Sequence, residues 1–464
     1  MPASPTTAGS PTDALREPLA TAVAAARSHG ALGTGALATA AQAVPLPDLI
    51  DAFAATTDDA FYWEQPAQEF GLLALGATAS IEVAGPGRFA EAASWWREIV
   101  ERASLATPSA TPFAAGGFAF AESPEVADGV WSAWPRGAWV APAVVLERRG
   151  AMSAVQLQVC EAEAMDSVQA LADAALRAQP SRAATAPPGI SLRDDPGHTW
   201  WDDSLRSVLE AIAAGDLRKQ VLARRVCAQA EASIDPAQVL RALRSRFPSA
   251  TIFAVRRGGA TFLGASPEEL VGLRGTAIEA AALAGTSRGT GDGRWLLDDP
   301  KERSEHAFVV EALRERLAPI CGRLDAPGVP QLMTLPDLSH LYTPVSGELL
   351  QPRGLLSLVE SLHPTPAVGA VPRAADRSRE LEPFDRGWYA GPVGWARGDS
   401  GGEGDAVVAL RSALVWENHA ALYAGCGIVP GSDPEIEWRE ARLKMEAVLG
   451  ALGVPADRDA GARG

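Results

Sequence analysis

TIFAVRRGGATFLGASPEELVGLRGTAIEAAALAG, residues 251–285, consists of short runs in which apolar and polar residues alternate, separated by Gly-Gly, Ser-Pro and Arg-Gly. Alternation with a period of two is typical of β-strands, and these separators favour turns. The stretch therefore predicts two or three successive strands. Because no helix lies between them to carry a crossover, we expect antiparallel pairing.

The flanking segments mix helices with strands. Residues 198–217 have an amphipathic helical pattern that ends at Gly215, and residues 235–248 predict a helix with an Asp N-cap. Residues 89–103 also have helical periodicity, whereas KQVLARRVCAQA, residues 219–230, is typical of a strand. The order shows no regular β-α-β rhythm. We therefore predict an α+β fold with large antiparallel sheets rather than a doubly wound parallel sheet.

Changes in composition divide the chain into five parts. Residues 1–40, rich in Ala, Ser, Thr, Gly and Pro, predict a flexible leader that passes into an Ala-rich helix. Residues 41–178 predict strands and hairpins that form the N-terminal part of the fold, and residues 179–197 predict a Pro-rich connector. Residues 198–452 contain the remaining helices and strands, and residues 453–464 form a tail.

Composition also excludes several classes of function. The 464 residues carry a net charge of −16, and an acidic surface repels phosphates and anionic lipids, so we expect neither nucleic-acid nor membrane binding. The N-terminus lacks the basic and apolar regions of a secretory signal, and no apolar run is long enough for a membrane span. The four cysteines form no CxxC pair, which argues against a zinc site. We expect a cytoplasmic globular protein.

Lysine is scarce, with only Lys219, Lys301 and Lys444 in the whole chain. A coding bias toward arginine explains most of this scarcity. Arginine can supply surface charge, but it cannot supply a neutral amine because the guanidinium group does not lose its proton in proteins. The three lysines are therefore candidates for positions where an amine is needed.

Four glutamates form two pairs at helical spacing. Glu302 and Glu305 lie in one predicted helix, Glu437 and Glu440 lie in another, and each helix begins at Asp-Pro. Residues at i and i+3 share a helix face, so the two pairs can enclose a hard divalent cation such as Mg²⁺, which prefers oxygen ligands. Alternatively, each pair belongs to a solvated face with surface salt bridges.

Two further residues have the chemistry of a base and an acid. Lys219 begins a predicted apolar strand, where desolvation can remove its proton, although it can also extend to water at the strand edge. Glu268 lies in a turn between strands, where burial can raise its pKa, although it can also be an ordinary turn residue. The loops around Gly285 and Gly427 either offer backbone amides to a carboxylate or form tight turns.

Taken in order, these motifs resemble the chorismate-binding enzymes, and most closely the isochorismate synthases. The N-terminal half is similar only through FYWEQP near Tyr62 and GGFAF near Gly117. The resemblance implies one large α+β fold with two stacked, mainly antiparallel sheets flanked by helices and a site between them. The matching motifs span residues 219–446: KQVLARR, FLGASPEEL, ALAGTSRG, DPKERSEH, LSHLYTPVSGEL, LHPTPAVGAVPR, GWYAGPVGW, VVALRSALV and AGCGIVPGSDPEIEWREARLKME.

The resemblance also implies residue roles. Lys219 corresponds to the general base that activates water for attack on C2 of chorismate, and Glu268 to the general acid that protonates the departing C4 hydroxyl. No role is implied for Lys301. Glu305 and Glu440 correspond to direct Mg²⁺ ligands, and Glu302 and Glu437 to their partners. The positions that correspond to substrate contacts are Gly285, Thr286, His363, Ala367, Tyr389, Arg411, Gly427 and Lys444.

The activity implied is that of a Mg²⁺-dependent isochorismate synthase, an isomerase that acts on the small molecule chorismate as a monomer. Ala367 stands where isochorismate synthases carry Ala and where salicylate and anthranilate synthases tend to carry Thr. The alternatives are a salicylate synthase, which eliminates pyruvate from isochorismate, an aminating anthranilate or aminodeoxychorismate synthase, and an inactive chorismate-binding scaffold. The sequence leaves open whether the product enters menaquinone, siderophore or other secondary metabolism.

Overall fold

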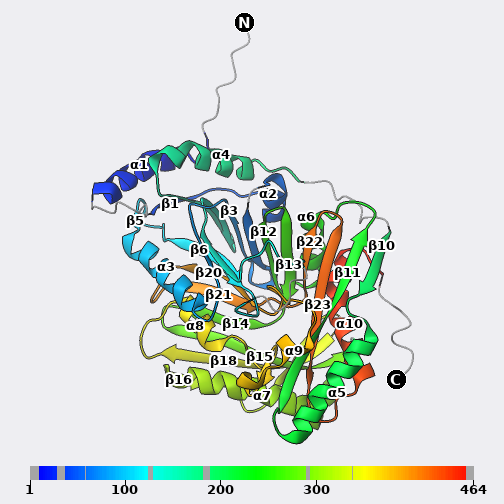
Figure 1. Ribbon diagram of the computed structural model, residues 1–464. Helices are drawn as coiled ribbons and strands as arrows, with labels where there is room; N and C mark the ends of the chain where they lie inside the picture. Colours follow the sequence, from blue (N-terminus) through cyan, green and yellow to red (C-terminus); the bar gives the residue numbers. More distant parts are fainter. Residues whose placement is uncertain are drawn as a thin grey trace.

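Two large β-sheets stacked face to face form the body of the molecule, and helices cover the outer face of each (Figure 1). The computed structural model describes residues 10–28, 37–57, 59–123, 129–180, 189–288, 293–336 and 338–455. Among the strands of these ranges, every pairing is antiparallel except that of β1 with β5. The predicted α+β class with stacked antiparallel sheets is confirmed.

The first sheet has 13 strands in the described ranges. One short strand, β19 (Ala370–Val371), pairs with β11 beside the main path. The order of the others is β10 (Ile190–Asp194), β11 (Lys219–Ala230), β23 (His419–Ile428), β22 (Ser412–Trp416), β13 (Ala260–Ser266), β12 (Thr251–Arg257), β2 (Ala60–Gln65), β3 (Phe70–Leu75), β8 (Val144–Arg149), β9 (Met152–Val159), β1 (Ala38–Ala43) and β5 (Ser104–Leu105).

The second sheet has ten strands in the same ranges. A short strand, β17 (Gln331–Thr334), pairs with β18 beside the main path. The order of the others is β16 (Cys321–Asp325), β18 (Leu338–Leu349), β15 (Ala277–Arg288), β14 (Glu269–Arg274), β21 (Glu403–Val408), β20 (Pro392–Arg397), β6 (Phe113–Phe118), β7 (Gly137–Ala141) and β4 (Ala79–Val83).

Helices pack on the two outer faces of the stack (Figure 1). The second sheet is covered by α3 (Arg88–Arg102), α7 (Pro300–Leu317) and α8 (Leu355–Leu362). A short helix, α9 (Ser378–Leu381), contacts β11. The helices on the first sheet are α1 (Asp13–Ser28), α2 (Leu49–Ala55), α4 (Met165–Leu176), α5 (His198–Ala214), α6 (Pro236–Arg246) and α10 (Pro434–Ala451).

Local signals in the sequence account for several of these elements. α5 ends at Gly215, whose φ of 86° lies in the left-handed region. Glycine adopts this conformation without strain because it has no Cβ atom. α6 begins after Asp235, whose side chain accepts a hydrogen bond from the Ala237 N–H. The predicted strand at residues 219–230 is β11, and the predicted helix at residues 89–103 is α3, one residue earlier. These predictions are confirmed.

The prediction of two or three strands in residues 251–285 is wrong, because this stretch contributes to four strands. β12 and β13 belong to the first sheet, whereas β14 and β15 belong to the second. The chain passes from one sheet to the other at Pro267 and Glu268. A pattern of alternation cannot reveal a change of sheet, because side chains alternate in the same way on both sides of the crossover. The crossover places Glu268 between the sheets.

Apolar side chains fill the space between the sheets. Trp63 from the first sheet and Trp139 and Trp395 from the second belong to one buried cluster, and each is at most 1% exposed. Aromatic side chains bury about 150–250 Å² each, so this layer contributes a large share of the hydrophobic stabilisation. Polar residues gather instead where β11, β23 and the β13–β14 crossover approach α7 and α10.

The first 40 residues, predicted as a leader, contain a helix and the start of a strand. Within the predicted leader, residues 1–40, α1 packs through Leu15 and Leu19, both buried, and β1 begins at Ala38. Residues 181–188 of the predicted connector and residues 456–464 of the predicted tail lie outside the described residues. Residues 397–405, which are rich in glycine, comprise the last residue of β20, the turn at 398–402 and the first residues of β21, which pairs with β20. None of the helices described is long and apolar enough to span a bilayer.

Candidate active site

Most of the predicted site residues line one cavity between the two sheets. They are carried by strands of both sheets, by the β13–β14 crossover, and by α7 and α10. Val221 and Val368 add apolar surface to the same lining. The predicted residues that line this cavity are Glu268, Gly285, Thr286, Glu305, Ala367, Tyr389, Arg411, Gly427 and Lys444.

Lys219 lies at the first position of β11 and is fully buried. Its Nζ atom donates to Oε1 of Glu305 on α7 at 3.0 Å. The pair lies against the backbone of Gly427 on the neighbouring strand β23, where a Cβ atom would overlap the Glu305 carboxylate and would lie 2.7 Å from Lys219 Cε. Glycine is therefore required at residue 427 by the close approach of these side chains.

Glu268 is 2% exposed in the crossover between the sheets. Burial raises its pKa to about 8, and the nearby charges of Lys219, Arg411 and Lys444 only partly oppose this shift. The nearest side-chain donor is Thr365, whose hydroxyl lies 3.5 Å from Oε1 of Glu268. At neutral pH this carboxyl group is mostly protonated, which makes it a proton donor.

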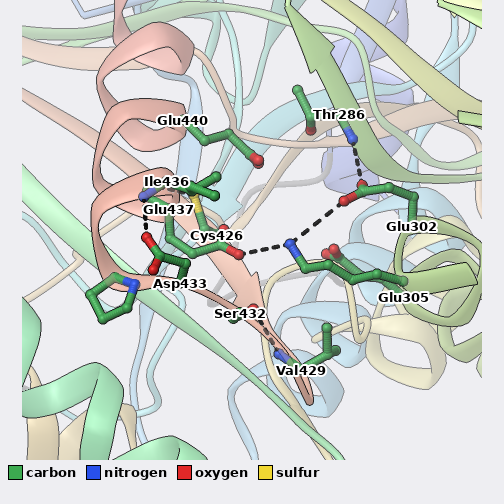
Figure 2. A network of polar contacts seen from close by, with 12 residues as sticks. Thr286, Glu302, Glu305, Cys426, Val429, Ser432, Asp433, Ile436, Glu437 and Glu440 are labelled. Atoms are coloured by element: carbon green, nitrogen blue, oxygen red, sulfur yellow. Dashed lines mark hydrogen bonds and ion pairs between the residues drawn. The ribbon is translucent and has the colours of Figure 1, made fainter. Parts of the chain in front are cut away.

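The two glutamate pairs face one another from different helices, as Figure 2 shows. Asp299 caps α7 by accepting from the Glu302 N–H at 3.0 Å, and Asp433 caps α10 in the same way through the Glu435 and Ile436 N–H groups. These caps fix where each helix begins, and they set which face carries the pair. Glu302 and Glu437 are buried, so neither pair is a solvated surface.

The carboxylates of these pairs influence one another. Burial and the adjacent Glu305 raise the pKa of Glu302 to about 7. Burial and the adjacent Glu440 also raise the pKa of Glu437. The environment of Glu440 differs: burial opposes ionisation, but the Lys444 ammonium outweighs this effect and holds the pKa of Glu440 below its usual value. A further positive charge would favour the ionised form of all these carboxylates.

Lys444 and Lys301 form ion pairs with carboxylates of the two acidic helices. Nζ of Lys444 donates to Glu440 Oε1 at 2.6 Å and to the Gly425 carbonyl at 3.1 Å. Nζ of Lys301 lies 2.8 Å from Glu437 Oε1 and 3.6 Å from Glu302 Oε1. Lys301, for which the sequence predicts no role, therefore bridges the two helices.

Gly285 shapes the strand that faces α7. Its φ is 76°, and it lies at an irregularity in the pairing of β15 with β18. The irregularity turns the Thr286 N–H toward Glu302, which accepts the hydrogen bond at 3.0 Å (Figure 2). A bulge of this kind redirects a local donor without ending the strand.

Arg411 is held by His340, a residue that the sequence did not single out. Nη2 of Arg411 donates to Nε2 of His340 at 3.1 Å, and Nδ1 of His340 lies 3.1 Å from the Gly285 carbonyl. Burial and the charge of Arg411 lower the pKa of His340 to about 3, so the ring is neutral and can accept from arginine. Arg411 has a φ of 50°, which is uncommon for a non-glycine residue. The only sequence signal for His340 is its place within LSHLYTPVSGEL.

Tyr389 is 4% exposed, and its ring stacks on that of Tyr423 at 5.3 Å. Its hydroxyl lies beside the backbone of Gly425, 3.3 Å from where a Cβ atom would be. Burial raises the pKa of Tyr389 to about 12, so the phenol is a hydrogen-bond donor at any physiological pH.

His363 does not lie in this cavity. It follows α8, is 1% exposed, and packs between the rings of Phe89 and Phe120 at 5.9 Å from each. Its Nε2 atom lies 3.4 Å from the Phe120 carbonyl. The position of His363 therefore does not support its predicted contact with the substrate, because these aromatic side chains enclose it in the core.

The acidic side chains of α7 and α10 fit a hard divalent cation. The bridging contacts of Lys301 show that a single cation can reach carboxylates of both helices. Glu437 and Glu440 each place an oxygen within 4.8 Å of the other and of Cys426 Sγ. Burial holds the pKa of the Cys426 thiol well above its usual value, so the sulfur stays protonated and leaves an oxygen donor set of the kind that Mg²⁺ prefers.

Comparison with known proteins identifies the family. A sequence model described as "chorismate binding enzyme" matches residues 22–453. The chain belongs to the chorismate-binding enzymes. The salicylate biosynthesis isochorismate synthase of Pseudomonas aeruginosa is 38% identical to it over 410 residues, which cover 84% of each chain. Isochorismate synthase MenF of Bacillus subtilis is 31% identical over 424 residues, covering 86% of this chain and 88% of the relative.

Solved structures show the same relationship. MenF, the menaquinone-specific isochorismate synthase from Escherichia coli, has a TM-score of 0.74 at 26% identity and covers 94% of this chorismate-binding enzyme and 100% of its own chain. A 2,3-dihydroxybenzoate-specific isochorismate synthase, DhbC, from Bacillus anthracis has a TM-score of 0.70 at 27% identity. The match covers 88% of this chain and 100% of the DhbC chain. The family and fold implied by the sequence motifs are thus confirmed.

Proposed function

We propose that this chorismate-binding enzyme is a Mg²⁺-dependent isochorismate synthase. One observation carries the proposal: Glu268, which is protonated at neutral pH, lines the same cavity as Gly427 and Glu305, which enclose the amine of Lys219. A proton donor in the cavity thus lies near an amine, held by the lining residue Glu305, that can become a base. The similarity to isochorismate synthases over more than four fifths of the chain gives independent support.

The proposed reaction exchanges one water molecule for another. Lys219 accepts a proton from the attacking water as its oxygen bonds to C2 of chorismate. The ring double bonds shift, the C4–O bond breaks, and Glu268 gives its proton to the departing hydroxyl, which leaves as water. Passage of a proton from Lys219 back to Glu268 through solvent restores both groups, so atoms and charge balance.

The contact between Lys219 and Glu305 places one requirement on this step. An ammonium group has no lone pair, so Lys219 must leave its ion pair and lose a proton before it can act as a base. Arginine cannot meet this requirement.

The cationic and hydrogen-bonding groups that line the cavity would bind the substrate. Arg411 and Lys444 line the cavity and would compensate the two carboxylates of chorismate within a protein of net charge −16. Tyr389 and the backbone around Gly285 add donors. Ala367 also lines the cavity, where its small side chain leaves room that a threonine would occupy.

Glu302, Glu305, Glu437 and Glu440 would hold Mg²⁺, with Glu305 and Glu440 as the direct ligands proposed. When bound, the ion supplies positive charge toward the ring carboxylate of the substrate. The carboxylates would hold this positive charge between α7 and α10, and Glu305 would present it to the cavity.

The test is a product assay with the full chain, chorismate and MgCl₂, followed by chromatography. Isochorismate as the main product is expected, and omission of Mg²⁺ should abolish it. Salicylate and pyruvate as main products would favour a salicylate synthase, and an ammonia-dependent aminated product would favour an aminating synthase. No turnover despite Mg²⁺ binding would indicate an inactive scaffold.

A further inference from the structure

We propose that Lys301 is an internal counter-cation for the acidic pairs of α7 and α10, and that Mg²⁺ displaces it on binding. This inference rests on the proposed metal site. It concerns a residue for which neither the sequence nor the reaction step supplies a role.

The first argument is the position of the ammonium group. Lys301 Nζ lies 2.8 Å from Glu437 Oε1 and 3.6 Å from Glu302 Oε1, so it touches one carboxylate of each acidic helix. A divalent cation held by the same two helices would lie next to this ammonium group. Two cations at such close range repel strongly, so occupation by one disfavours the other.

The second argument is burial. The side chains of Glu302 and Glu437 are 8% and 2% exposed. Buried carboxylates without a partner are costly, and the lysine compensates both of them when no metal is bound. Lys301 is therefore placed to compensate the ionised forms of both carboxylates when Mg²⁺ is not bound.

The third argument is that local helix preferences do not explain a lysine here. Lys301 is the second residue of α7, immediately after Pro300 in the first turn. The first turn of a helix carries a partial positive charge and favours acidic residues, so a lysine there is mildly unfavourable. Its contact with Glu437, 136 residues away in sequence, is what compensates this effect.

The fourth argument separates Lys301 from the other two lysines. The side chains of Lys219 and Lys444 are 0% and 14% exposed, whereas that of Lys301 is 28% exposed. Lys301 can therefore turn outward into water without leaving a buried, unpaired charge. Lys219 and Lys444 cannot do so.

The experiment is a calorimetric titration of MgCl₂ into metal-free wild type, Lys301→Gln and Arg303→Gln. Arg303→Gln is the matched control, because it removes the same charge from an exposed position on the same helix, where the guanidinium group donates only to the Leu297 carbonyl among the contacts described. We expect Lys301→Gln to bind Mg²⁺ about tenfold more tightly than wild type, equivalent to about 1.4 kcal/mol. Arg303→Gln should stay within about twofold of wild type, because its charge is solvated.

A second readout uses melting temperatures. In EDTA, Lys301→Gln should melt below Arg303→Gln, since its carboxylates have lost their counter-cation, and saturating MgCl₂ should remove this difference. Equal Mg²⁺ affinities for the two variants, or equal melting in EDTA, would overturn the inference while leaving the proposed function intact. Absence of Mg²⁺ binding by wild type and Lys301→Gln alike would overturn the proposed metal site itself, and this inference with it.

Discussion

Nζ of Lys219 lies 3.0 Å from Oε1 of Glu305, and the two side chains meet over a backbone position that has no room for a Cβ atom. That position is Gly427 of β23. The relationship joins the proposed base to a proposed metal ligand, so the geometry of both depends on one glycine.

Substitution Gly427→Ala should therefore reduce kcat/KM by about a hundredfold, because displacement of catalytic groups by about 1 Å has effects of this size. Gly87→Ala is the control, since a Cβ atom there meets nothing within 4 Å. Steady-state kinetics and circular dichroism of both variants measure the effect. Normal activity of Gly427→Ala would show that the Lys219–Glu305 pair is not needed in this arrangement.

Lys219→Arg should keep the positive charge but lose turnover by about 10²–10⁴-fold, because arginine cannot take a proton from water. Chorismate affinity, measured by equilibrium binding, should change much less than kcat. Near-normal turnover in Lys219→Arg would remove the base assignment.

Glu268 should set an upper pH limit on activity. Its pKa is about 8, so the proton donor is present below pH 8 and is lost as pH rises through this value. A profile of kcat/KM from pH 6 to pH 10 should fall on the alkaline side near pH 8. A flat profile through this range would contradict the acid assignment.

The same carboxyl group should couple stability to pH. The folded pKa lies above the unfolded value, so the protonated group contributes stability fully below pH 4.5, and this contribution is lost as pH rises toward 8. Glu268→Gln has no proton to lose, so the melting temperature of wild type relative to this variant should decrease from pH 5 to pH 8. Parallel melting curves would show that Glu268 does not titrate in this range.

Glu440→Gln should weaken Mg²⁺ binding and abolish Mg²⁺-dependent activity, because it removes a proposed direct ligand and the partner of Lys444. Glu435→Gln is the matched control on the same helix, where the glutamate is 49% exposed and pairs with Arg439. Calorimetry should separate the two variants. Retention of Mg²⁺ affinity in Glu440→Gln would place the metal elsewhere.

His340→Leu should raise the KM for chorismate about tenfold, since a hydrogen bond to a charged group contributes about 1.5–3 kcal/mol and Arg411 loses its acceptor. His340→Gln supplies both an acceptor for Arg411 and a donor for Gly285 and should restore much of the affinity. Mg²⁺ affinity should be unchanged in both variants. Equal KM values for the two variants would show that His340 acts only through packing.

The sequence alone was enough to predict elements whose signals lie within a few residues. The Asp-Pro starts of α7 and α10, the end of α5 at Gly215 and the extent of β11 all agree with the structure. The ordered motifs also identified the family. The number of strands in residues 251–285 was missed, because the change of sheet at Glu268 leaves the alternation of side chains unaltered.

What the tertiary structure decided is which distant residues meet. Glu305 lies 86 positions from Lys219, and Glu437 lies 136 positions from Lys301, so no local pattern relates them. Packing between the layers also buries Glu268 and places His340 beside Arg411. The same packing encloses His363 among aromatic side chains. Sequence determined the family, most local elements and the chemical groups available, because those are set by motif order and short-range periodicity. The structure decided their partners and charge states, because desolvation and ion pairing act through space between segments that the fold brings together.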